Sequence, residues 1–148
     1  MQKHQRRLRR IGPAQKAGLD LSSLGLLYNG AETVRAATLE QFIEAFGACG
    51  LRREALFPCY GMAEATLLVA GGPRGRAPHI LAVDSAALER GQVREALARQ
   101  AGSRKMVSCG PAAPGVEVAV VDPARCLPLG EDEVGELWIA GPGIARGY

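Results

Sequence analysis

The pattern of apolar and polar positions in the first half of the chain predicts a strand, a helix and a second strand. Residues 24–29 are an apolar run that closes on an Asn-Gly turn signal, as a short buried strand does. Apolar side chains then recur on one helical face, at Leu39, Phe42, Ile43 and Phe46. Thr38 is a candidate N-cap for this helix, and Gly47 and Gly50 indicate its end. Leu56-Phe57 predicts the second strand.

The first residues of the chain carry a basic run. Residues 2–17 have a helix-forming composition, and Gly12-Pro13 is expected to end or restart the helix. The basic side chains are Lys3, Arg6, Arg7, Arg9 and Arg10. Such a run can mark nucleic-acid binding or a targeting signal, but it lacks interleaved aromatic residues, an apolar secretion segment and abundant serine. We expect a solvated helix face and no nucleic-acid partner.

The pattern changes after the Gly/Pro/Arg-rich residues 71–78, which form the best internal boundary. Residues 79–83 read as a strand, and residues 85–100 fit a helix weakened by Gly91. Alternating apolar positions then predict strands around residues 116–121 and 134–140. The fold class that follows is α/β, with mixed strands and helices followed by a β-rich portion.

Composition excludes several classes of protein. The chain has 148 residues, 47% hydrophobic and 22% charged, with a net charge of +3, which is a globular composition. Its apolar stretches fall short of the roughly 20 residues of a membrane span. The four cysteines (Cys49, Cys59, Cys109 and Cys126) form no C-x-x-C pair and have no histidine at zinc-ligand spacing. We expect free thiols in a reducing cytoplasm, with no metal framework and no disulfide scaffold.

Two segments carry residues suited to a nucleotide. In Tyr28-Asn29-Gly30-Ala31-Glu32 a strand ends in small residues, which lets backbone approach a flat base or a phosphate. Taken by itself, this segment is better interpreted as an ordinary structural turn. In residues 60–64, Tyr60 offers an aromatic face, Gly61 clears space and Glu64 offers an oxygen ligand for magnesium. The structural alternative is a buried tyrosine and a surface glutamate beside a glycine turn.

A third segment, Gly-Glu-Leu-Trp-Ile-Ala-Gly-Pro-Gly-Ile-Ala-Arg-Gly-Tyr over residues 135–148, predicts a strand followed by glycine turns and has an architectural role. The three segments together resemble the adenylate-forming superfamily, which includes acyl-CoA synthetases, luciferases, peptide-synthetase adenylation domains and fatty acyl-AMP ligases. Their order and separations match those of the superfamily. The fold expected from the resemblance is part of the large N-terminal domain of such an enzyme.

The resemblance implies a role for each matching residue. The nucleotide-binding residues would be Gly30, Ala31 and Glu32 in the turn, and Tyr60, Gly61, Met62 and Ala63 in the second segment. The tyrosine would pack on adenine, and Glu64 would be the catalytic residue that holds Mg²⁺. Most members have threonine where Ala63 stands, whereas fatty acyl-AMP ligases commonly show Tyr-Gly-Leu-Ala-Glu-Ala-Thr, so the sequence is most similar to that branch.

The same branch carries an insertion after the second segment. We therefore expect three regions: residues 1–72 as an α/β part with the Tyr-Gly-Met-Ala-Glu motif, residues 73–106 as an insertion-containing region, and residues 107–148 as a β-rich part. Cys109 is expected to be a packed thiol and not a nucleophile, because no histidine partner is apparent.

The activity implied is ATP-dependent activation of a fatty acid to an acyl-adenylate. The acyl group would then pass to the thiol of an acyl carrier protein, or of a polyketide or peptide synthase, in lipid metabolism or in polyketide or lipopeptide biosynthesis. The phosphate loop, ribose-binding aspartate and catalytic lysine of complete members have no counterpart in these residues, so we expect a fragment that is inactive alone. The alternatives are a non-catalytic remnant or scaffold and, within the enzyme class, an acyl-CoA synthetase.

Overall fold

The computed structural model describes residues 11–147, and the prediction for residues 2–10 lies outside them. The helices are α2 (Pro13–Ala17), α3 (Ala36–Phe46) and α4 (Ser85–Glu89), with 3-10 turns at η1 (Gly47–Cys49), η2 (Arg53–Ala55) and η3 (Ala63–Ala65). The strands are β1 (Leu27–Asn29), β2 (Leu56–Met62), β3 (Leu67–Gly71), β4 (Ile80–Asp84), β5 (Ser103–Val107), β6 (Glu117–Asp122), β7 (Leu127–Pro128) and β8 (Glu136–Ala140). The α/β class is confirmed.

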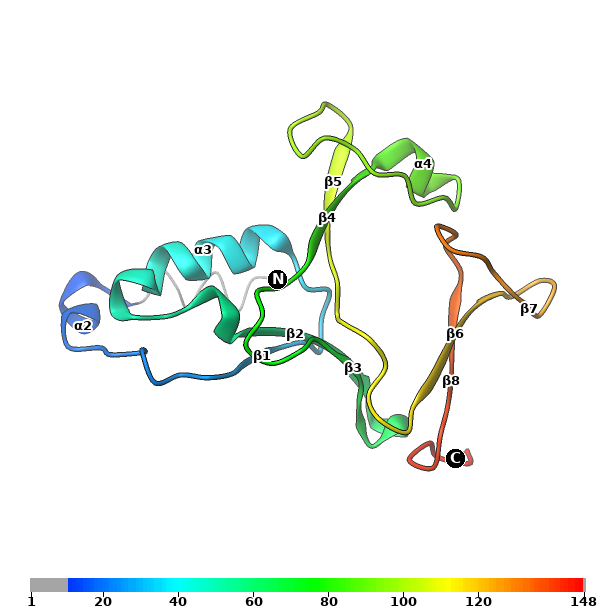
Figure 1. Ribbon diagram of the computed structural model, residues 1–148, viewed down its shortest axis with the longest axis horizontal. Helices are drawn as coiled ribbons and strands as arrows, with labels where there is room; N and C mark the ends of the chain where they lie inside the picture. The colour runs from blue at the N-terminus through cyan, green and yellow to red at the C-terminus, as the bar shows by residue number, and fades with distance from the viewer. Residues whose placement is uncertain (1–10, 148) are drawn as a thin grey trace.

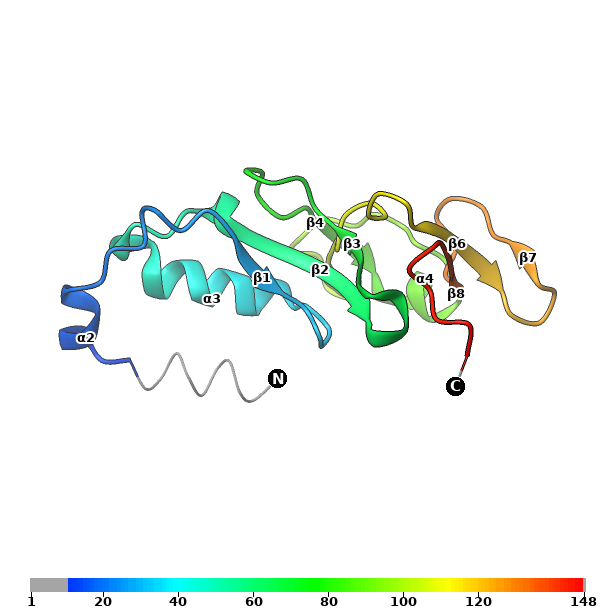
Figure 2. The ribbon, with the colours of Figure 1, turned by 90° about the horizontal axis from the view of Figure 1, so that it is seen from below.

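The first sheet has the order β1-β2-β3. Strands β1 and β2 are parallel, with Leu27 opposite Leu56, and α3 joins them along one face of the sheet (Figures 1 and 2). Strand β3 returns antiparallel to β2, with a register shift between Tyr60 and Gly61. Strand β3 is not among the elements that the sequence pattern predicts, because Leu-Leu-Val-Ala-Gly has no alternation of apolar and polar positions.

Three local predictions in this sheet need correction. The strand expected over residues 24–29 is confined to β1, and Tyr28 is 59% exposed, with its ring edge against Phe57. Thr38 is not the N-cap: the helix begins two residues earlier, and the extended residue Arg35 occupies the cap position without a side-chain bond. The second strand runs on to Met62, so the Tyr-Gly-Met segment lies within the strand and does not follow it.

The end of α3 agrees with the sequence. Its last turn passes into η1, and Gly50 has a left-handed φ of 86°. The Phe46 side chain is buried with Leu51 and Ala55, and partly buried apolar side chains surround them, including Phe42 and Ile43 of the expected helical face. The apolar stripe of α3 thus supports the core at this end of the chain.

The second sheet pairs β4 with β5 antiparallel, from Ile80 opposite Val107 to Asp84 opposite Ser103. The helix expected over residues 85–100 is α4 alone. Asp84 caps it by accepting a 2.6 Å bond from the Ala87 N–H, and Gly91, at φ 77°, lies just beyond its end. Strand β5 had not been expected, and the boundary drawn after residue 106 falls inside it.

The third sheet has the order β7-β6-β8 and confirms the alternation expected near the end of the chain. Val118 lies opposite Ile139 and Val120 opposite Leu137, so these four side chains share one face. Among the described residues, no helix is long and apolar enough to cross a membrane.

Candidate functional site

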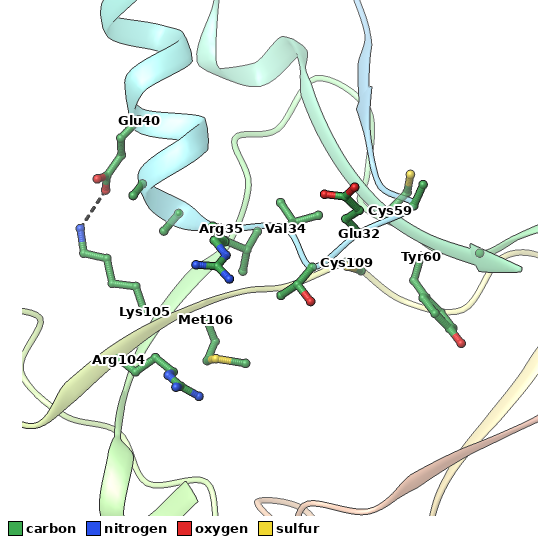
Figure 3. A pocket seen from close by; sticks show the side chains of 16 residues that line it. Glu32, Val34, Arg35, Glu40, Cys59, Tyr60, Arg104, Lys105, Met106 and Cys109 are labelled. Atoms are coloured by element: carbon green, nitrogen blue, oxygen red, sulfur yellow. Dashed lines mark hydrogen bonds and ion pairs between the residues drawn. The ribbon is translucent and has the colours of Figure 1, made fainter. Parts of the chain in front are cut away.

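A pocket of about 910 Å³ lies where the turn after β1, the start of α3, strand β2 and strand β5 meet. Figure 3 shows Tyr60 on β2 at one side of it, and Arg104 and Met106 on β5 at another. Because β1 and β2 are parallel neighbours, their carboxyl ends reach the same edge of the sheet. The fold therefore brings the first two sequence segments to one cavity.

Of the predicted nucleotide-site residues, Ala31, Glu32, Tyr60 and Gly61 line this pocket. Gly30 lies beside a smaller recess that also borders Glu32. A Cβ on Gly30 would lie 2.8 Å from the Cys59 carbonyl oxygen and 3.0 Å from its Sγ. Glycine is thus required at position 30 by the close approach of the turn to β2.

Tyr60 is the aromatic side chain at the pocket edge. It is 36% exposed, and its hydroxyl donates a long 3.9 Å bond to the Met62 Sδ. A ring held at the mouth of a cavity with this exposure offers a flat surface to a base. Tyr60 is therefore the residue of the site best placed for stacking.

Gly61 serves the hairpin as well as the pocket. A Cβ at this position would overlap the carbonyl oxygen of Leu67 on the returning strand. The sequence predicts that glycine clears space for a ligand, whereas the space where a Cβ would stand is filled by the hairpin's own backbone. The register of β2 against β3 shifts beside this glycine, between Tyr60 and Gly61.

Met62, Ala63 and Glu64 lie beyond the residues that line the pocket, at the end of β2 and in η3. Glu64 is half-buried. Its main-chain carbonyl oxygen accepts a 2.7 Å bond from the Ala145 N–H of the third segment. Within residues 11–147 no group of three metal-ligating side chains occurs. The Glu64 carboxylate could hold a magnesium ion as its single protein ligand. Phosphate oxygens of the nucleotide and water molecules would complete the coordination.

Several pocket residues were missed by the sequence reasoning. Arg35, Glu40, Arg104, Lys105 and Met106 all line it, the first two from the start of α3 and the others from β5. The Lys105 Nζ lies 2.8 Å from the Glu40 Oε1. The basic pair at residues 104–105 next to apolar residues 106–107 was the available signal, but it was assigned to the insertion-containing region.

Two cysteines, Cys59 and Cys109, also line the pocket. Burial, and secondly the charge of the Cys59 thiolate, raise the pKa of the Cys109 thiol. A thiol with a raised pKa is a weak nucleophile at neutral pH, because the reactive form is the thiolate. Cys109 is also half-buried, as expected of a packed thiol.

Comparison with known proteins gives a consistent family. The family model described as AMP-binding enzyme matches residues 2–148. The chain is 41% identical over 140 residues to a medium-chain-fatty-acid–[acyl-carrier-protein] ligase of Teredinibacter turnerae, covering 95% of this chain and 22% of that protein. It is 37% identical over 130 residues to a long-chain-fatty-acid–AMP ligase of Mycolicibacterium smegmatis, covering 88% of this chain and 21% of that protein.

Solved structures agree. The fatty acid AMP ligase from Legionella pneumophila superposes with a TM-score of 0.92 at 41% identity, over 98% of this chain and 25% of that one. The fatty acyl-adenylate ligase from the same organism, in complex with acyl adenylate and pyrophosphate, gives a TM-score of 0.90 at 41% identity, with the same coverage. The chain thus spans about a quarter of the length of the relatives it matches.

Proposed function

We propose, since this chain belongs to the AMP-binding enzyme family, that it forms part of a fatty acyl-AMP ligase that activates a fatty acid with ATP. One observation carries the proposal: Ala31 and Glu32 from one strand end and Tyr60 from the next line a single cavity. A small-residue turn on one side and an aromatic ring on the other suit a flat adenine base. The family supports ATP as the nucleotide.

The reaction we propose needs no covalent enzyme intermediate. A carboxylate oxygen of the fatty acid forms a bond to the α-phosphorus of ATP. The bond between the α-phosphorus and the oxygen that bridges it to the β-phosphate breaks, and pyrophosphate leaves with that electron pair. This chain contributes to binding and orientation, with Tyr60 under the base and the turn at residues 30–32 beside it. Mg²⁺, held by Glu64, would neutralise phosphate charge.

The substrate class rests on the relatives and on one position. Relatives are named as ligases of medium- or long-chain fatty acids, and Ala63 stands where most adenylate-forming enzymes have threonine. We propose a fatty acid as substrate and the phosphopantetheine thiol of a carrier protein or of a polyketide or peptide synthase as acceptor. The four free cysteines support a cytoplasmic setting. Residues 73–106 remain our proposal for the insertion-containing region, supported by the separate β4–β5 sheet.

The test is ATP–pyrophosphate exchange by the protein expressed from its complete gene, with medium- and long-chain fatty acids. Tyr60→Ala should raise the apparent Kd for ATP by roughly 5- to 150-fold, the equivalent of the ~1–3 kcal/mol of a base–aromatic stack. Tyr60→Phe is the matched control and should bind nearly as wild type, because the bond that its hydroxyl makes within residues 11–147 is the long one to Met62. Glu64→Gln should lower the exchange rate at saturating ATP.

Absence of exchange with every fatty acid tried would remove the ligase proposal. Exchange that Tyr60→Ala leaves unaltered would remove the assignment of the base to this pocket. The acceptor is tested separately: acyl transfer to a carrier-protein thiol but not to coenzyme A is expected, and the reverse result would place the protein with the acyl-CoA synthetases.

A further inference from the structure

The turn that joins η3 to β3 is strained and contains no glycine. Thr66 has φ 52° and the next residue, Leu67, has φ 82°. Both angles lie in the left-handed region, which is unfavourable for side chains with a Cβ and most of all for a β-branched residue. Such a conformation persists only where neighbouring contacts hold it.

Besides the 3.3 Å bond from the Thr66 N–H to the Ala63 carbonyl oxygen, two bonds join the turn and the preceding Glu64 to the third sequence segment. The Thr66 hydroxyl donates a 2.6 Å bond to the Gly143 carbonyl oxygen. The Ala145 N–H donates a 2.7 Å bond to the Glu64 carbonyl oxygen. Segments 77 residues apart in the sequence are thereby joined around the proposed magnesium ligand.

The partner side is shaped for this contact. A Cβ on Gly143 would lie 2.9 Å from the Thr66 Oγ1. Glycine at position 143 therefore allows the hydroxyl to reach the main chain. Thr66 is exposed to solvent, so the fit is not a consequence of core packing.

We propose that Thr66 is a positioning residue: its hydroxyl, bonded to Gly143, holds the left-handed turn and with it the backbone of Glu64. The inference rests on the proposed function, because it gives the turn its purpose through the magnesium ligand. Without the hydroxyl bond the turn is no longer held in one backbone conformation, least of all when glycine replaces threonine and both signs of φ become accessible. Glu64 is then not fixed in the position from which it would hold the ion.

The main experiment compares Thr66→Gly with Thr66→Ser in the protein expressed from its complete gene. Thr66→Gly removes the hydroxyl and also relieves the strained φ, so the fold should survive, whereas Thr66→Ser keeps the hydroxyl. We expect Thr66→Gly to need roughly fivefold more Mg²⁺ for half-maximal exchange, with an unchanged or higher Tm. Thr66→Ser should stay close to wild type, and Leu67→Gly, which relieves only the neighbouring strain, is the matched control.

Gly143→Ala tests the contact from its other side. Its Cβ crowds the hydroxyl, so the same rise in Mg²⁺ requirement is expected, and the double variant with Thr66→Gly should lose no more than either single variant. If either Gly143→Ala or Thr66→Gly impairs folding, the other variant still tests whether the contact affects the Mg²⁺ requirement. Equal Mg²⁺ dependence in wild type, Thr66→Gly and Gly143→Ala would overturn the proposal, as would a Thr66→Ser variant as impaired as Thr66→Gly.

A readout independent of catalysis separates this inference from the proposed function. Amide hydrogen exchange at Ala145, whose N–H bonds Glu64, should be roughly five- to tenfold faster in Thr66→Gly and unchanged in Thr66→Ser. A wild-type protein without exchange activity would refute the ligase proposal, while this measurement would still decide the positioning role. Equal protection of Ala145 in all variants would refute that role.

Discussion

Tyr60 and Gly61 stand side by side in the motif, yet the structure separates what each does. Tyr60 presents a ring at the pocket edge. Gly61, which has no Cβ, lets the Leu67 carbonyl oxygen of the returning strand approach β2 closely. Residue type alone predicted both at the site, because an aromatic face and a missing Cβ both suit a nucleotide. The backbone reason for the glycine was not predictable, since β3 had not been recognised and its position opposite Gly61 was unknown.

The double duty of Gly61 predicts a cost to stability. Gly61→Ala places a Cβ on the Leu67 carbonyl, so the hairpin must open or shift. We expect a loss of about 3 kcal/mol, at the upper end for an overpacked site, seen as a lower Tm of the protein expressed from its complete gene. Gly25→Ala is the matched control, because a Cβ there meets nothing within 4 Å, and should change stability by less than about 0.5 kcal/mol. Similar Tm values for the two variants would contradict the structural role.

The Cys109 thiol predicts a dependence of stability on pH. Burial first, and the Cys59 charge second, raise its pKa, so the folded state holds the proton more tightly than the unfolded chain. The resulting stabilisation is fully present below the unfolded thiol pKa of about 8.5 and is lost as pH rises through the folded pKa. Cys109→Ser should therefore flatten the alkaline fall in Tm, measured from neutral pH upwards. Cys126→Ser controls for loss of a thiol as such, and a Cys109→Ser curve parallel to wild type would refute the linkage.

At the scale of elements, β5 is tied to α3 at the rim of the pocket. The Lys105 Nζ lies 2.8 Å from the Glu40 Oε1, and both side chains are about two-fifths exposed (43% and 42%). Figure 3 shows the pair beside the cavity that the two elements share. The ion pair therefore joins the two elements where both line the pocket.

Exposed ion pairs contribute little to the free energy of unfolding, so breaking this pair should have only a small effect on stability. Lys105→Ala should lower stability by no more than about 1 kcal/mol, and the difference from wild type should shrink as salt is raised. Thermal unfolding at low and high salt measures it. A double-mutant cycle with Glu40→Ala gives the coupling, and Arg99→Ala, on an exposed turn, is the matched control. A larger loss that persists in high salt would mean that β5 packs on α3 through other contacts.

Elements with a strong period were predictable, and those decided by a few contacts were not. The stripe through Phe42 and Phe46 gave α3, and the alternation of Val118 with Val120 gave β6. Strand β5 reads Ser-Arg-Lys-Met-Val, with three exposed residues and no period. Helix α4 is confined to Ser85–Glu89, and Gly91, with a left-handed φ of 77°, lies just beyond its end. At the site, the motif residues were predictable from a resemblance, but the α3 and β5 residues enter the pocket only through tertiary packing.

At the scale of the whole molecule, the sheets are spread out: in Figure 1 the β4–β5 sheet stands above the first sheet, and the β7-β6-β8 sheet lies to its right. The buried cluster of Phe46, Leu51 and Ala55 lies at the opposite end, beside α3. Main-chain bonds join the sheets, such as Gly71 N–H to the Pro111 carbonyl at 3.1 Å and Val93 N–H to the Asp132 carbonyl at 2.7 Å. In the third sheet, Leu137 and Trp138 are each 46% exposed, on opposite faces. Apolar side chains are thus exposed on both faces of this sheet. Such exposure is typical of a sheet that packs against further protein.

The exposed apolar side chains of the described residues lead to the last prediction. Each sheet has one, for example Leu67 at 73%, Met106 at 41% and Leu137 at 46% exposure. This leaves little buried apolar area to support a strongly cooperative transition. We expect the 148-residue chain, expressed alone, to bind a hydrophobic dye and to unfold over a broad temperature range. It should also bind ATP weakly, because the phosphate loop and ribose-binding aspartate that the resemblance implies have no counterpart in these residues. The protein expressed from the complete gene should bind less dye and unfold sharply. A sharp, dye-free transition of the 148-residue chain, with ATP affinity equal to that of the longer protein, would show that these residues pack into a compact unit by themselves.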